Sequence, residues 1–156
     1  MSAATSKFVD IVQESFGHLA AVHEMWLSSA SEGLICFESS TAFLHVIHDY
    51  RRLGELSVVI GPVSASDDRR IGFGLDEILR LQALPSARYV AGLRTHDPVA
   101  LADAVASLSE LTEQHAAKYL GGDAEQFAIV AGFRKKESAE YALAREQRRT
   151  ARGRNR

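Results

Sequence analysis

The segment from Ala42 to Val63, AFLHVIHDYRRLGELSVVIGPV, concentrates the side chains that could do chemistry. Two histidines three residues apart, His45 and His48, are followed by Asp49 and Glu55. On a helix this spacing would bring both imidazoles to one face, where they could bind a metal ion. The neighbouring residues are β-branched or aromatic, which indicates a strand instead. Side chains alternate along a strand, so the two histidines would point to opposite faces and could not chelate one metal ion.

Asp49 and Glu55 flank the turn DYRRLGEL and raise the possibility of a metal-dependent nuclease. A helix followed by three strands and a helix resembles the start of the PD-(D/E)xK nuclease core. That family holds a divalent metal and a water with an acid near one strand and an E-x-K on the next. Here the lysine after Glu55 is missing, and no lysine lies between Lys7 and Lys118. We therefore prefer two acids flanking an exposed hairpin turn and keep a degenerate nuclease as an alternative.

Other catalytic signatures are missing from the sequence. There is no G-x-G-x-x-G loop and no G-x-S-x-G, so we expect no cofactor. The single cysteine, Cys36, lies in the apolar LICF and is read as a small buried hydrophobe. With no apolar signal region and no apolar run long enough for a membrane span, we expect a bacterial cytoplasmic protein.

The net charge of −2 hides a division between an acidic body and a basic end. From Arg134 onward there are nine Lys/Arg and three Asp/Glu, a charge of +6, so the preceding residues carry −8. An acidic body suits a basic protein partner, such as a basic toxin domain. The basic end is either the solvated terminus of a helix or a nucleic-acid contact.

Hydrophobic periodicity predicts one α+β domain over residues 1–145, followed by a basic, disordered tail over 146–156. Residues 5–16 form an amphipathic helix that Gly17 ends. For the stretch from His18 to Trp26 we prefer strand pairing over helix continuation because of that glycine. After a turn over 28–33, three short β-rich segments (LICFES, AFLHVIHDY and ELSVVIGPV) predict an antiparallel meander.

The second half of the sequence predicts a mobile loop over 64–74 and a short helix over 75–82. Residues 83–96 are irregular or hold one short strand around 89–93. Asp97 and Pro98 begin a helix that runs to about Leu120, and a last helix runs from Asp123 to about Arg145. The expected fold is therefore an N-terminal helix, a three- or four-stranded meander, and two or three C-terminal helices packed on one sheet face.

This arrangement is similar to small bacterial proteins of the polymorphic-toxin immunity type. The resemblance is carried by FESSTAFLHVIHDYRRLGELSVVIG, by GLDEILRL, and by a long helix closing with YLGGDAEQF. It covers roughly residues 5–134 and brings no catalytic residues. It implies a protein that works by binding another protein.

The sequence thus predicts a non-enzymatic binding module that neutralises a cognate toxin by occlusion. Its alternatives are the degenerate nuclease and a nucleic-acid accessory protein that acts through the basic end. The residues expected to contact a partner are aromatic anchors and acids of the meander and its loop: Trp26, Glu38, Asp49, Tyr50, Glu55, Asp67 and Asp68.

Overall fold

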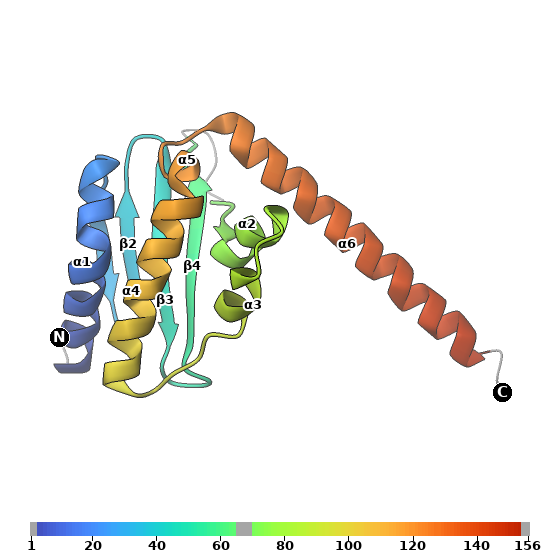
Figure 1. Ribbon diagram of the computed structural model, residues 1–156, viewed down its shortest axis with the longest axis horizontal. Coiled ribbons are helices and arrows are strands. Elements are labelled where there is room, and N and C mark those ends of the chain that lie inside the picture. Colours follow the sequence, from blue (N-terminus) through green and yellow to red (C-terminus); the bar gives the residue numbers. More distant parts are fainter. Residues whose placement is uncertain (1–2, 65–69, 154–156) are drawn as a thin grey trace.

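The computed structural model describes residues 3–64 and 70–153 (Figure 1). An N-terminal helix precedes five strands, and five further helices follow. In chain order the elements are α1 (Ala3–Val22), β1 (Trp26–Ser31), β2 (Leu34–Glu38), β3 (Ala42–Asp49), β4 (Glu55–Pro62), β5 (Phe73–Gly74), α2 (Leu75–Leu81), α3 (Ser86–Ala91), α4 (Pro98–His115), α5 (Ala117–Leu120) and α6 (Ala124–Gly153). The predicted α+β class is confirmed.

The sheet is a meander in which each strand pairs with the next along the chain. Its order is β1-β2-β3-β4-β5, and all four pairings are antiparallel. The expected three or four strands become five because the short β5 pairs with β4 through Val59 and Gly74. The β3–β4 hairpin keeps its register along both strands, from Ala42 opposite Pro62 to Asp49 opposite Glu55.

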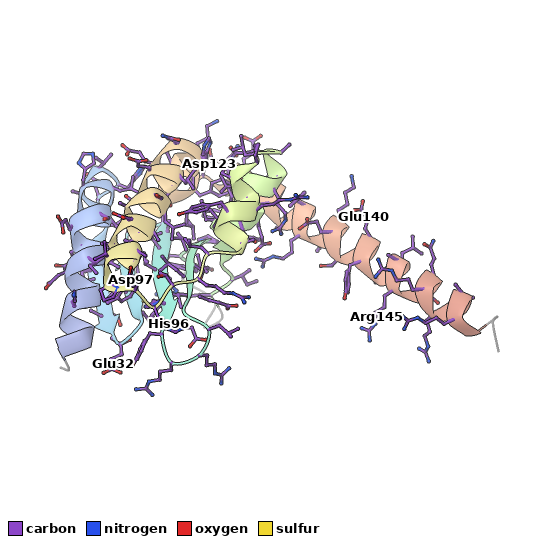
Figure 2. All side chains as sticks on the ribbon, turned by 60° about the horizontal axis from the view of Figure 1, so that its bottom comes forward. Glu32, His96, Asp97, Asp123, Glu140 and Arg145 are labelled. Carbon is purple, nitrogen blue, oxygen red and sulfur yellow. The ribbon has the colours of Figure 1, made fainter. Side chains whose placement is uncertain are left out.

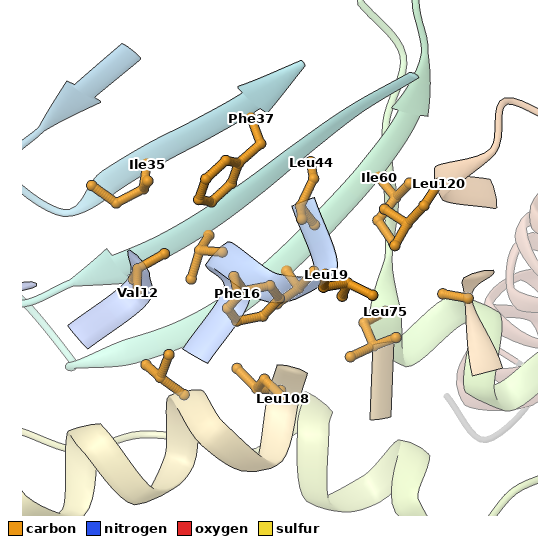
Figure 3. Close-up of a cluster of buried hydrophobic side chains, with 14 of the residues drawn as sticks. Val12, Phe16, Leu19, Ile35, Phe37, Leu44, Ile60, Leu75, Leu108 and Leu120 are labelled. Carbon is orange, nitrogen blue, oxygen red and sulfur yellow. The ribbon is translucent and has the colours of Figure 1, made fainter. Parts of the chain in front are cut away.

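One face of the sheet packs against the helices and forms the core (Figure 3). The apolar stripe of α1 meets alternate side chains of β2, β3 and β4, and α4 packs beside α1. The side chains that Figure 3 labels at this contact are Val12, Phe16, Leu19, Ile35, Phe37, Leu44, Ile60, Leu75, Leu108 and Leu120. Burial of this apolar surface is the main force that holds the helix layer on the sheet.

Helix α1 continues through Gly17, so the expected helix end there is wrong. Leu19 and Ala20 extend the apolar stripe and are buried, and this burial outweighs the cost of one glycine within the helix. The chain turns only after Val22, where Glu24 takes a positive φ of 54°. The stretch from His18 to Trp26 is therefore mostly helix, with the strand beginning at its last residue.

Replacing Gly17 with alanine should raise the free energy of unfolding by about 0.5–1 kcal/mol. A Cβ built at Gly17 meets nothing within 4 Å, so alanine would gain helix propensity without a clash. Urea unfolding of the variant checks this expectation. A loss of stability would mean that the chain does not run helically through residue 17.

Strand β1 occupies most of the stretch expected to be a turn. All six of its residues are exposed and three are serines, so no buried apolar pattern marks it in the sequence. It forms because β2 offers a free edge, with Leu27 opposite Phe37 and Ala30 opposite Ile35. The turn is confined to Glu32 and Gly33.

The helices after the sheet differ from the expectation in two places. Residues 86–91 form α3 instead of a short strand, and only Arg94 makes an isolated β-bridge, with Glu55. The helix expected to reach Leu120 breaks at Ala116 into α4 and α5. Its predicted start is confirmed, since the Asp97 carboxylate accepts the backbone N–H groups of the first turn.

Helix α6 begins on the body and then projects away from it (Figure 1). Asp123 caps its first turn by accepting the N–H groups of Glu125 and Gln126. Phe127 and Val130 are buried against the body, as expected. The helix is continuous to Gly153 and so passes the expected end near Arg145. Within the described residues, no helix combines the length and apolar character that a bilayer crossing requires.

Candidate protein-binding surface

The sheet face opposite the helices is left uncovered by them, and we call it the uncovered face. Residues paired across neighbouring antiparallel strands point to the same side of a sheet, which fixes the members of this face. Its side chains come from four strands: Trp26, Ser29 and Ser31 of β1; Leu34, Cys36 and Glu38 of β2; Phe43, His45, Ile47 and Asp49 of β3; and Glu55, Ser57 and Val59 of β4.

The two histidines of the β3 strand lie on opposite faces, as alternation predicts. His48 faces the helix layer, is 8% exposed, and its Nε2 lies 2.9 Å from the carbonyl oxygen of Thr95. His45 is half-buried on the uncovered face, with its ring centroid 4.6 Å from that of Phe43. The described residues contain no group of three or more His, Cys, Asp or Glu that could hold a metal ion.

The centre of the uncovered face is apolar and only partly shielded. Leu34, Ile47 and Val59 are half-buried although no helix covers them. Leu34 lies opposite Ile47, and Val59 lies diagonally across from Ile47 on β4, so these three side chains are neighbours on the sheet. The fold is therefore a two-layer α+β protein in which no helix of the described residues covers one sheet face.

Arg70 crosses one end of the uncovered face and pairs with Glu38. Its guanidinium makes two hydrogen bonds to the carboxylate, at 2.7 and 2.9 Å, and lies 5.7 Å from the Phe43 ring centroid. The hydrogen bonds from Arg70 lower the pKa of Glu38. The arginine and His45 together explain why Phe43 is only 2% exposed on a face without helices.

Two glycines allow the chain after β4 to lie close to Phe43. A Cβ at Gly61 would stand 2.4 Å from the Phe43 ring, and one at Gly72 would stand 2.3 Å from Val59. Any larger residue at either position would clash. The two glycines therefore allow the segment that carries Arg70 to lie close against the sheet. The sequence prediction placed Gly61 in a strand and Gly72 in a loop and did not show this contact.

Cys36 lies near the centre of the uncovered face and is 8% exposed, so its expected burial is confirmed. Burial raises the pKa of its thiol, which therefore stays protonated at neutral pH. The neutral thiol acts here as a small apolar group between the larger side chains.

Trp26 stands at the edge of the uncovered face, opposite Glu38 on β2. The side chain is 54% exposed, which is high for the largest apolar residue type. An exposed tryptophan at one end of a sheet face is the kind of side chain that can anchor a protein partner.

The far end of the face carries Asp49 and Glu55, which pair across the β3–β4 hairpin. Glu55 makes an ion pair with Arg94 at 2.9 Å, and the same two residues form the isolated backbone bridge. Of the five acids expected to contact a partner, Glu38 and Glu55 are therefore already paired with arginines. Within the described residues, Asp49 makes no ion pair.

Tyr50 belongs to a separate hollow on the helix side of the same end. Its hydroxyl donates a hydrogen bond to Glu32, and Arg51 binds both groups, with its Nε 2.9 Å from the Tyr50 oxygen. Figure 2 shows Glu32, His96 and Asp97 at this end of the body. The hollow has a volume of about 150 Å³, and its walls include Lys7, Phe8, Ile11, His48 and Leu101.

The structure brings together four of the seven residues expected to contact a partner. Trp26, Glu38, Asp49 and Glu55 share the uncovered face, while Tyr50 lies at the separate hollow. Asp67 and Asp68 fall outside the described residues. Sequence reasoning missed Arg70, Leu34, Ile47 and Val59, because alternation shows which side chains share a face but not which face the helices cover.

No protein-family model, curated protein or solved structure matches this chain.

Protonation of His45 should destabilise the protein below about pH 6.5. Burial lowers the pKa of His45 and the nearby Arg70 lowers it further, against a smaller opposing effect of Glu38. The stabilisation is therefore present above the unfolded-state pKa and is lost as pH falls through the lower folded-state pKa. The wild type should lose more stability between about pH 7.5 and 5.5 than His45→Asn, as measured by urea unfolding. Equal losses would contradict this role of His45.

Proposed function

We propose that this chain is a protein-binding module of the immunity type, which neutralises a cognate bacterial toxin by covering its active site. The observation that carries the proposal is the uncovered face, which holds half-buried aliphatic side chains at its centre and the exposed Trp26 at one end. The resemblance to immunity proteins extends over the elements that build this face. Binding by such a surface requires no catalytic residue in this chain.

The proposed interface has an apolar centre and a polar rim. Leu34, Ile47 and Val59 form the centre, and the Arg70–Glu38 and Arg94–Glu55 pairs lie at its two ends. Interfaces of this anatomy gain most of their affinity at the desolvated centre, while rim charges set the association rate and the choice of partner. Asp49 supplies a rim acid that is free to meet a basic group of the toxin.

Co-expression with the product of the neighbouring gene, which the proposal expects to be a toxin, tests the proposal. The full chain should restore growth of the host and should co-purify with the toxin as a stable complex. A chain that neither restores growth nor binds the toxin would refute the proposal. Restored growth without a complex would also count against it, because occlusion requires lasting contact.

A further inference from the structure

The half of α6 beyond its contacts with the body, residues 138–153, stands free in solvent, and we call it the free arm (Figure 1). Arg134 and Glu137 make the last ion pairs to α2. From residue 138 to 153 every side chain except Ala144 is exposed. A helix of this length is only marginally stable by itself in water, so contacts within the arm do not account for its helical structure.

The arginines of the free arm lie on one face. At about 100° per residue, Arg145, Arg148, Arg149 and Arg152 fall within an arc of about 100°, and Tyr141 lies in the same arc. This arc continues the stripe through which Phe127 and Val130 pack on the body. The two glutamates of the arm, Glu140 and Glu146, fall outside it. Figure 2 shows Glu140 and Arg145 on the projecting half of α6.

These arginines have no partner within the described part of the chain. None of the six ion pairs includes them, although the rest of the protein carries excess acid. The arc contains four arginines and one tyrosine that is 71% exposed, and it lacks an apolar seam. Packing this arc against the same arc of a second copy would bring like charges together, which disfavours a helical dimer.

We infer that the free arm binds the phosphate backbone of a nucleic acid. Arg145 and Arg152 are separated by about 10 Å along the helix axis, so the arginines suit a row of phosphates better than one carboxylate. A guanidinium offers two parallel N–H donors to each phosphate. Tyr141 adds a flat, exposed ring on which an unpaired base can stack. The acidic body would repel the same polyanion, which confines binding to the arm.

Fluorescence anisotropy of the full chain with labelled nucleic acid tests this inference. The probes are a duplex DNA of about 20 base pairs and a single-stranded RNA of similar length, at salt concentrations between about 50 and 200 mM. Four phosphate contacts predict a slope of log K against log salt of about −3.6 for the duplex. Arg145→Gln/Arg148→Gln should weaken binding by about tenfold or more and halve the slope.

Lys135→Gln/Lys136→Gln is the matched control, because it removes the same charge from α6 outside the arginine arc. This variant should bind within about threefold of the wild type. Circular dichroism should show unchanged helix content in both variants, since Gln and Arg have similar helix propensities.

Four results would overturn the inference. These are no binding at low salt, equal losses in the two double variants, equally good competition by poly-glutamate, and a salt-sensitive dimer that Arg145→Gln/Arg148→Gln dissociates. The last result would assign the arm to a second copy of the chain. Toxin neutralisation is independent of all four, because it is proposed for the uncovered face.

Discussion

Replacing Arg134 with methionine should lower the free energy of unfolding by about 2 kcal/mol. The Arg134 Nε donates a 2.8 Å hydrogen bond to Glu77, and one Nη donates both to Glu77 and, at 2.8 Å, to the carbonyl of Gly72. The guanidinium also lies 4.4 Å from the Phe73 ring centroid. One side chain thus ties α6 to α2 and β5. This expected loss of stability is smaller than for a fully buried ion pair because the Arg134 side chain is 38% exposed.

The loss of stability caused by Arg134→Met should be smaller at acid pH. Burial acts to raise the pKa of Glu77, but hydrogen bonds from Arg134 and the Gly74 N–H outweigh it and lower the pKa. The stabilisation is therefore present above the unfolded-state pKa of about 4.3 and is lost as pH falls through the folded-state value. The stability difference between the wild type and Arg134→Met should shrink below about pH 4.

Arg148→Met provides the control for this prediction, because Arg148 lies on the same helix without an ion pair in the described residues. Its stability should stay within about 0.5 kcal/mol of the wild type. Urea unfolding of the two variants makes the comparison. Equal stabilities for Arg134→Met and Arg148→Met would show that the contacts of Arg134 do not hold α6 on the body.

In the proposed complex with a toxin, replacing Trp26 with alanine should weaken binding by at least about 30-fold while leaving the fold intact. The indole is 54% exposed at the edge of the sheet, so its removal opens no large cavity in the core. In a complex that covers the uncovered face, the indole would become buried beside Glu38, its partner on β2. Calorimetric titration of the toxin module with the variant gives the affinity.

Tyr89→Ala is the matched control for Trp26→Ala. Tyr89 is also an exposed aromatic residue, at 48%, but it lies on α3 beside a hollow that α4 helps to form. Its removal should change the affinity by less than about threefold. Comparable losses from both substitutions would mean that affinity follows general surface aromaticity and not the uncovered face.

The sequence predicted the central strands because their signal is local. The apolar runs of β3 and β4 alternate in register, and this alternation alone predicts that His45 and His48 lie on opposite faces. The capping group of α4 was equally local, since Asp97 and Pro98 are adjacent in the chain. Such features depend on neighbours within a few residues and can be found without tertiary information.

Other features depend on partners distant in sequence and escaped prediction. Strand β1 has no apolar pattern and exists through its pairing with β2. Continuation of α1 past Gly17 depends on the burial of Leu19 in the core. The ion pair between Arg70 and Glu38 joins segments separated by 32 residues. In each case a tertiary contact outweighs the local preference of the chain.

The candidate site was predicted only in part for the same reason. Alternation grouped Asp49 with His45, but both faces of β3 carry large apolar side chains, with Leu44 and Val46 on one side and Phe43 and Ile47 on the other. Hydrophobicity therefore could not decide which face the helices would cover. That choice depends on how the stripes of α1 and α4 meet the sheet.

The most direct test of the uncovered face as the binding surface places a charge at its centre. Ile47→Asp should weaken binding of the toxin module by about 100-fold or more, because an unpaired carboxylate would be buried at the interface. Val99→Asp, at a 71% exposed position on α4, is its control and should bind as the wild type does. Urea unfolding of both variants confirms that each is folded at the concentrations used. Wild-type affinity in folded Ile47→Asp would contradict the account and place the binding surface elsewhere on the protein.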